Sequence, residues 1–189
     1  MATQKHTQIL AFVGLPGSGK STAVEYFTKN GFPKVYFGGV ILEAMRAEGI
    51  EITPENEKNF RESFREEHGK DVVVNRIVEQ IQNLIDAGQR RIIADGLYTW
   101  TEYKILKKAF PRELTLVAIV APRRTRYRRL AERPIRPLTA TEAYDRDTSE
   151  IENLEKGGPI AIADHYITNN VSVEALYKTL AELQEDIAF

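Results

Sequence analysis

The segment GLPGSGKST, residues 14–22, combines three glycines, one lysine and three hydroxyl side chains. Its spacing is G-x-x-x-x-G-K-[ST], with Gly14, Gly19, Lys20 and Ser21 at the fixed positions. Between a strand and a helix, glycines allow successive backbone N–H groups to converge on phosphate oxygens. The helix N-terminus adds partial positive charge, Lys20 reaches the terminal phosphates, and the Ser21 hydroxyl can ligate Mg²⁺. The segment therefore predicts a site for a nucleotide di- or triphosphate.

The neighbouring residues agree with this prediction. The apolar run QILAFV before the loop is typical of a buried strand, and STAVEYFTKNG after it favours a helix that ends at Gly31. An ordinary glycine-rich turn explains one or two glycines, but not a lysine and a hydroxyl at their required positions. We expect the nucleotide to contact Gly14, Gly17, Ser18, Gly19, Lys20, Ser21 and Thr22.

A carboxylate follows the third apolar strand candidate, RRIIADGL, at Asp95. Ligands of doubly wound sheets bind at the carboxyl ends of the strands, so Asp95 is expected to face the phosphate loop. There it can hold Mg²⁺ through water or orient an acceptor group. The alternative is a local turn, because Asp-Gly pairs are common at strand ends.

Positive charge is concentrated in one segment, residues 121–137, which holds seven arginines, no lysine and one acid. For Arg123, Arg124 and Arg128 an exposed helix face suffices as an explanation. An RNA-binding patch needs interleaved aromatic residues, and only Tyr127 is present.

Arginine also suits a phosphate clamp, because its planar cation binds phosphate through two N–H groups. Arg126, Arg129 and Arg133 have the spacing of one helix face, and Arg136 lies in the proline-containing loop beyond it. We expect Arg133 and Arg136 to neutralise the transferring phosphoryl group and Arg129 to bind the nucleotide, with Arg146 as a further candidate.

Alternating strand and helix signals predict one α/β domain, residues 1–189, with a mainly parallel sheet. The expected strands are 8–13, 34–37, 91–95, 114–120 and 163–168. The expected helices are 19–30, 40–48, 54–67, 71–87, 100–110, 122–133, 140–155 and 171–187. The long connection between the second and third strands predicts a substrate-covering arm at about 38–88, and the Pro/Arg loop predicts a lid at about 133–140.

The amino-acid composition argues against several kinds of site and of binding partner. The chain has 42% hydrophobic and 28% charged residues, which is typical of a globular protein. It contains no cysteine, which excludes disulfides, a Cys-based zinc site and a thiol nucleophile. A net charge of −1 argues against general nucleic-acid binding. With no apolar signal region and no long apolar run, we expect a cytoplasmic protein without a membrane partner.

The phosphate loop, IIADG, RYRRLAER and IAIADHYITNN together resemble the P-loop nucleotide kinases. Their order resembles the adenylate kinase and nucleoside monophosphate kinase group, including its archaeal relatives, and the last segment is similar to dephospho-CoA kinase. The resemblance implies a P-loop NTPase fold with a five-stranded sheet, an acceptor arm, an arginine-bearing lid, and Mg²⁺ with ATP as the donor. It also implies that Asn169, Asn170 and Val171 border the adenine, with Asn170 as a nucleotide contact.

The acceptor half departs from this pattern. Gly39 stands where adenylate kinases carry an aspartate, and Leu42 and Thr99 stand at their two acceptor-arginine positions. The segment NFRESFRE offers Arg61 and Arg65, four residues apart, as substitutes. Two readings stay open: the neighbouring phenylalanines 60 and 64 stack on a nucleotide-like acceptor, or they anchor the arm while the arginines pair with nearby glutamates.

These residues together predict an ATP-dependent phosphotransferase acting on a nucleotide or nucleotide-like small molecule. Lys20 is expected to hold the β- and γ-phosphates, Ser21 the magnesium ion, and Asp95 the magnesium shell or the acceptor. The alternatives are a hydroxyl kinase similar to dephospho-CoA kinase, and an ATP-binding switch or ATPase without a small-molecule acceptor. The Asp-Glu pair of motor-type ATPases follows none of the predicted strands.

Overall fold

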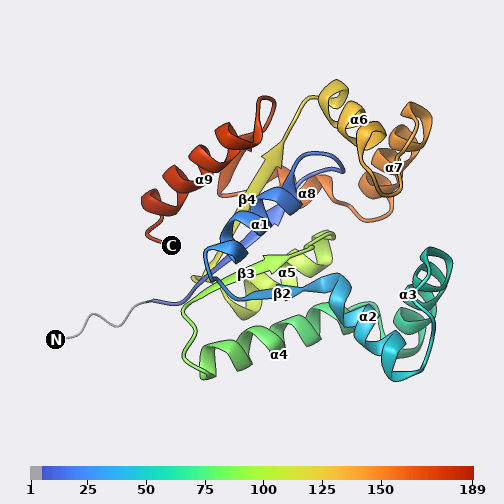
Figure 1. Cartoon of the computed structure of the whole chain (residues 1–189). Helices are drawn as coiled ribbons and strands as arrows, with labels where there is room; N and C mark the ends of the chain where they lie inside the picture. Colours follow the sequence, from blue (N-terminus) through green and yellow to red (C-terminus); the bar gives the residue numbers. More distant parts are fainter. Residues whose placement is uncertain (1–5) are drawn as a thin grey trace.

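A five-stranded parallel sheet lies at the centre of the protein (Figure 1). The computed structural model describes residues 6–189, apart from the side chains of Pro54, Glu55 and Lys58. The strands are β1 (Gln8–Val13), β2 (Lys34–Tyr36), β3 (Arg91–Asp95), β4 (Leu114–Val120) and β5 (His165–Thr168). They lie in the order β2-β3-β1-β4-β5, and every neighbouring pair is parallel. The predicted α/β fold is confirmed, and the loop after β1 leaves the middle of the sheet at its carboxyl edge.

Helices cover both faces of the sheet and extend beyond its carboxyl edge (Figure 1). They are α1 (Lys20–Lys29), α2 (Phe37–Ala47), α3 (Pro54–His68), α4 (Val72–Asp86), α5 (Trp100–Ala109), α6 (Arg123–Glu132), α7 (Ala140–Glu152), α8 (Gly157–Ala161) and α9 (Val173–Asp186). None of these helices is long and apolar enough to cross a membrane.

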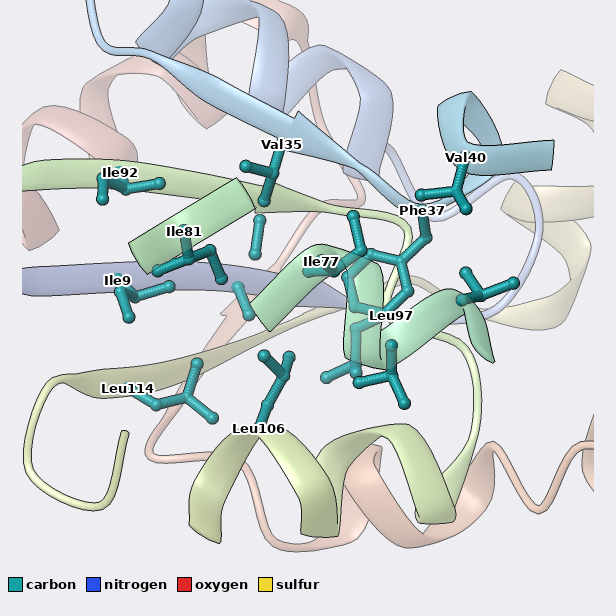
Figure 2. Packing of buried hydrophobic residues seen from close by; sticks show 14 of the residues in the cluster. Ile9, Val35, Phe37, Val40, Ile77, Ile81, Ile92, Leu97, Leu106 and Leu114 are labelled. Atoms are coloured by element: carbon teal, nitrogen blue, oxygen red, sulfur yellow. The ribbon is translucent and has the colours of Figure 1, made fainter. Parts of the chain in front are cut away.

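The alternation of side chains along β1 divides the core into two clusters. Ile9, Ala11 and Val13 face the larger cluster with residues of α2, α4 and α5, whereas Leu10 and Phe12 face α1 and α9. Figure 2 shows the larger cluster, in which Ile77 and Ile81 of α4 lie against the sheet. Because β1 is buried on both faces, the loop that follows it begins from a rigid support.

Most element boundaries agree with the sequence expectations within two or three residues. The sequence motifs TWTE and TATE predict capping boxes at Thr99–Glu102 and Thr139–Glu142, and the structure confirms both. In each, the threonine hydroxyl oxygen accepts from the glutamate N–H, and the glutamate carboxylate accepts from the threonine N–H. Two differences are that α2 begins at Phe37 rather than Val40 and that the short helix α8 was not predicted. Two adjacent glycines lie at the start of both segments, followed in α8 by a proline, and these residues weaken any helical signal there.

Arg126 joins α6 to α7 and to the phosphate loop. Its guanidinium donates to both carboxylate oxygens of Asp147, at 2.8 and 2.6 Å, and to the carbonyl oxygen of Pro16 at 3.0 Å. Arg126 is 5% exposed, so this contact is buried. Arg126 and Arg129 share the face of α6 that reaches the phosphate loop, as expected, but Arg133 lies just beyond the end of that helix.

We expect Arg126→Met to lower the free energy of unfolding by about 3–5 kcal/mol, because it leaves the Asp147 carboxylate buried without its partner. Arg128→Met is the matched control, since Arg128 is exposed on the same helix and its loss is expected to cost less than about 0.5 kcal/mol. Urea unfolding followed by circular dichroism measures both. Equal midpoints for the two variants would contradict the structural role of Arg126.

Candidate functional site: a phosphate loop beside an arginine-lined cavity

The carbonyl groups of the phosphate loop, residues 14–22, are held by its own Lys20 and by side chains from α6 and from the end of β5. The contacts are Lys20 Nζ to Gly14 O (2.7 Å) and Leu15 O (3.2 Å), Arg126 to Pro16 O (3.0 Å), Arg129 to Gly17 O (3.5 Å), and Asn169 Nδ2 to Ser18 O (2.8 Å). The N–H and C=O of a trans peptide point in opposite directions. The carbonyls of residues 16–18 point toward α6 and the end of β5, where they accept hydrogen bonds. The N–H groups of residues 17–19, which belong to the same three peptides, therefore point away from those elements. This is the backbone arrangement that an anion-binding loop requires.

The N-terminus of α1 continues the same donor surface. Gly19 precedes the helix with a φ of 105°, and no side chain caps the first turn. The first N–H groups of a helix have no intrahelical partner, and they carry partial positive charge. A Cβ at position 19 would collide with the amide of Asn169, and a Cβ on Gly17 would lie 2.7 Å from Arg126 O. Glycine is thus required where the loop passes closest to its neighbours.

Lys20 is half-buried and lies among other charged groups. Burial lowers the pKa of Lys20 to about 7, the Lys156 and Arg146 cations lower it too, and Glu150 and Asp95 oppose them. Its ammonium group hydrogen-bonds only loop carbonyls among the described residues. An arriving phosphate can therefore replace those carbonyls and favour the charged form.

Asp95 lies at the carboxyl end of β3, beside β1, as the sequence predicts. Its carboxylate lies 3.3 Å from Lys34 Nζ of the neighbouring strand β2. Ser21 is exposed in the first turn of α1. Among the described residues no three His, Asp or Glu side chains gather as a metal site.

A cavity of about 350 Å³ lies on the outer side of the phosphate loop, between Thr22, Arg129 and the segment before α9. Arg129 donates to the Asn169 backbone oxygen at 3.0 Å and to its side-chain oxygen at 3.3 Å. Asn170, which the sequence singled out as a nucleotide contact, is exposed. The neighbouring Asn169 is the residue that contacts the loop and Arg129, and the NN pair was the only sequence signal for it.

A second cavity, of about 430 Å³, opens between the arm, the start of α5 and α7. Four arginines line it, together with three acids and three aromatic side chains: Arg61, Arg65, Arg136, Arg146, Glu57, Glu102, Glu150, Tyr36, Phe37 and Tyr98. Arg133 does not line this cavity, but its Nε donates to the carbonyl of Arg136. Burial and the neighbouring Arg146 and Arg136 cations lower the pKa of Arg133, which places three arginines close together.

The arm arginines differ in how well they are paired. Arg61 forms an ion pair with Glu57 one turn away, as one of the two readings predicted. Arg65 reaches Glu102 at 3.6 Å, and its buried Nε has no hydrogen-bond partner. The rings of Phe60 and Phe64 stack on each other at 5.4 Å and are 8% and 3% exposed. The phenylalanines therefore anchor the arm, and the reading in which they stack on an acceptor was wrong.

Sequence reasoning missed Lys156 and Glu150 altogether. Lys156 is 1% exposed, pairs with Glu150, and lies 4.4 Å from the centre of the Tyr98 ring. Their contact spans the turn between α7 and α8, so neither residue belongs to a periodic pattern that a sequence can reveal.

The sequence model of the AAA domain family matches residues 10–155. A UPF0200 protein of Thermococcus kodakarensis is 34% identical over 182 residues, covering 95% of this chain and 97% of that protein. A UPF0200 protein of Methanocaldococcus jannaschii is 31% identical over 182 residues, covering 95% and 90%.

Two solved structures have the same fold over nearly the whole chain. Shikimate kinase from Acinetobacter baumannii has a TM-score of 0.61 at 16% identity, covering 96% of this chain and 95% of that one. Dephospho-CoA kinase from Campylobacter jejuni has a TM-score of 0.60 at 17% identity, covering 95% and 96%. The resemblance to P-loop kinases is thereby confirmed at the level of the fold.

We expect Mg·ADP to bind with uptake of about one proton at pH 8, because phosphate favours the charged form of Lys20. Below pH 7 Lys20 is largely charged with or without nucleotide, so the affinity for Mg·ADP should not change with pH there. As the pH rises above 7, the affinity for Mg·ADP should fall by up to about tenfold per pH unit. Calorimetry in two buffers of different protonation enthalpy measures the uptake. Lys20→Arg stays charged and should show none; equal uptake in both proteins would contradict this assignment.

Proposed function

We propose that this chain, which belongs to the AAA domain family and to the UPF0200 proteins, transfers the γ-phosphoryl group of Mg·ATP to a small anionic acceptor. The observation that carries the proposal is the adjacency of two surfaces. Arg126 joins Pro16 of the phosphate loop to Asp147 of α7, and Arg146 and Glu150 of the same helix line the cavity and influence the pKa of Lys20. A phosphoryl group held by the loop would therefore face a molecule held in the cavity.

In this proposal the protein positions reactants and neutralises charge without forming a covalent intermediate. Lys20 and the N–H groups of the loop bind the β- and γ-phosphates, Ser21 and Asp95 hold the magnesium shell, and Arg129 borders the nucleotide. Magnesium, when bound, neutralises phosphate charge. An acceptor oxygen forms the new bond to the γ-phosphorus as the bond to the β,γ-bridging oxygen breaks, and ADP leaves. Arg136, with Arg133 behind it, faces the charge of the transferring group.

The acceptor we infer is nucleotide-like and carries a negative charge. The unpartnered Nε of Arg65 supports this, because a buried donor without an acceptor is costly unless a ligand supplies one. Leu42 and Thr99 replace the arginines that grip AMP in adenylate kinases, so AMP is expected to be a poor acceptor. A hydroxyl kinase is the second candidate, since Asp95 at the end of β3 offers a carboxylate toward an acceptor proton.

The test is ADP production from Mg·ATP with a panel of nucleoside monophosphates, nucleosides and dephospho-CoA. At least one acceptor should accelerate ADP release, and Lys20→Ala should remove most of that activity because it deletes the phosphate cation. Lys29→Ala, at an exposed position of the same helix, is the control. ADP release that no acceptor accelerates would favour the ATPase or switch, and AMP as the best acceptor would contradict the reading of Leu42 and Thr99.

Arg65→Met should raise the KM of the preferred acceptor at least tenfold, a loss of about 1.4 kcal/mol, while the KM for ATP stays unchanged. Arg46→Met, at an exposed position of α2, is the matched control and should change neither constant. Steady-state kinetics with both substrates varied provides the measurement. An unchanged acceptor KM in Arg65→Met would place the acceptor elsewhere.

A further inference from the structure

Lys156 has no role in the proposed transfer, and Glu150 enters it only as a residue of the cavity lining. Lys156 and Glu150 form an ion pair in which the lysine is 1% exposed and the glutamate side chain 9% exposed. Removing two charges from water is expensive, and such a pair often contributes no more stability than apolar residues of the same size. A structural role alone therefore gives a weak account of why the pair is charged.

Glu150 uses its two oxygens for two different cations. One carboxylate oxygen accepts from Lys156 Nζ, and the other accepts from Arg146 Nε at 3.2 Å. The two cations differ in exposure, because Lys156 is enclosed beside the Tyr98 ring whereas Arg146 is 47% exposed and lines the acceptor cavity. The contact with Lys156 is therefore fixed, and the contact with Arg146 can be exchanged.

The surroundings favour such an exchange. Arg133 and Arg136 lie near Arg146, and the Arg146 cation also lowers the pKa of Lys20. Arg146 thus belongs to a group of cations that repel one another, and Glu150 is the carboxylate that contacts it. A phosphate oxygen in the cavity offers Arg146 an alternative anion of equal or greater charge.

We propose that Glu150 and Lys156 form a positioning pair: Glu150 holds Arg146 at the cavity edge until an anionic group replaces it, and Lys156 keeps Glu150 in place when Arg146 leaves. The inference rests on the proposed function for its purpose, since the arriving anion would be an acceptor or transferring phosphate. It concerns the binding of anions, and it is testable without turnover.

The pair predicts effects of opposite sign on anion affinity. Lys156→Met leaves Glu150 with Arg146 as its remaining contact, so the cavity should bind inorganic phosphate at least threefold more weakly. The double variant Glu150→Gln/Lys156→Met removes the competing carboxylate together with its buried partner, and phosphate should bind at least fivefold more tightly. In an Arg146→Ala background both differences should disappear. A purely structural pair would shift both variants in the same direction.

Inorganic phosphate is titrated into full-length protein saturated with Mg·ADP, and into protein without nucleotide. Trp100, the only tryptophan of the chain, supplies the fluorescence signal. Its ring packs against Gly158 of α8, where an added Cβ would lie 2.7 Å from it. Melting temperatures of all variants identify any that fail to fold, and the double variant, which keeps no unpaired buried charge, is expected to remain stable.

Opposite shifts that depend on Arg146 support the inference. The inference is overturned if the phosphate affinities of the two variants shift in the same direction or equal that of the wild type. It is also overturned if the shifts persist without Arg146, or if the wild type does not bind phosphate. Failure of the proposed function shows itself separately, as the absence of acceptor-dependent ADP release in the wild-type protein.

Discussion

The contact of Arg126 with both Pro16 and Asp147 is the constraint on which the rest of the site depends. One guanidinium orients a peptide of the phosphate loop and fixes α7 against α6. Residues 133–146, which include Arg133, Arg136 and Arg146, begin at the end of α6 and continue into α7. Their distance from the phosphate loop is thus set by a buried, forked contact, and a lysine could not make three such bonds in fixed directions.

The sequence predicted the parts of this fold that local chemistry determines. The phosphate loop follows from glycines and one lysine at fixed spacing, β1 from an apolar run, and α5 and α7 from capping boxes that lie within four residues. The contacts it could not predict join distant residues. Arg126 and Asp147 are 21 positions apart, and Asn169 lies 151 positions from Ser18. A helical spacing of arginines reveals a face, but which of them turns inward depends on the helix packed against it.

The two sides of the site are built differently. The phosphate loop acts through its backbone groups, so few residue types fit its positions. A Cβ at Gly17 would collide with α6, and a Cβ at Gly19 would collide with Asn169. The cavity of about 430 Å³ is instead formed by side chains. Arginines, glutamates and tyrosines line it, from α3, α5, α7, the end of β2 and the loops before α5 and α7. Such a lining can be exchanged residue by residue without disturbing the sheet beneath it. The same fold is therefore found in kinases named for shikimate and for dephospho-CoA, and the fold alone does not determine what this cavity binds.

Tyr36 and Tyr98 form an aromatic part of the lining of the 430 Å³ cavity. The ring of Tyr36 lies over the first turn of α2, where a Cβ on Gly38 would come to 2.5 Å from it and force the ring to move. Burial raises the pKa of Tyr98 to about 12, so its hydroxyl stays protonated and can donate a hydrogen bond at neutral pH. The cavity therefore contains two aromatic side chains with hydroxyl groups, one from the end of β2 and one from the loop before α5. In the proposed transfer, such a surface would favour a planar acceptor with hydrogen-bond acceptors at its edge over a compact sugar.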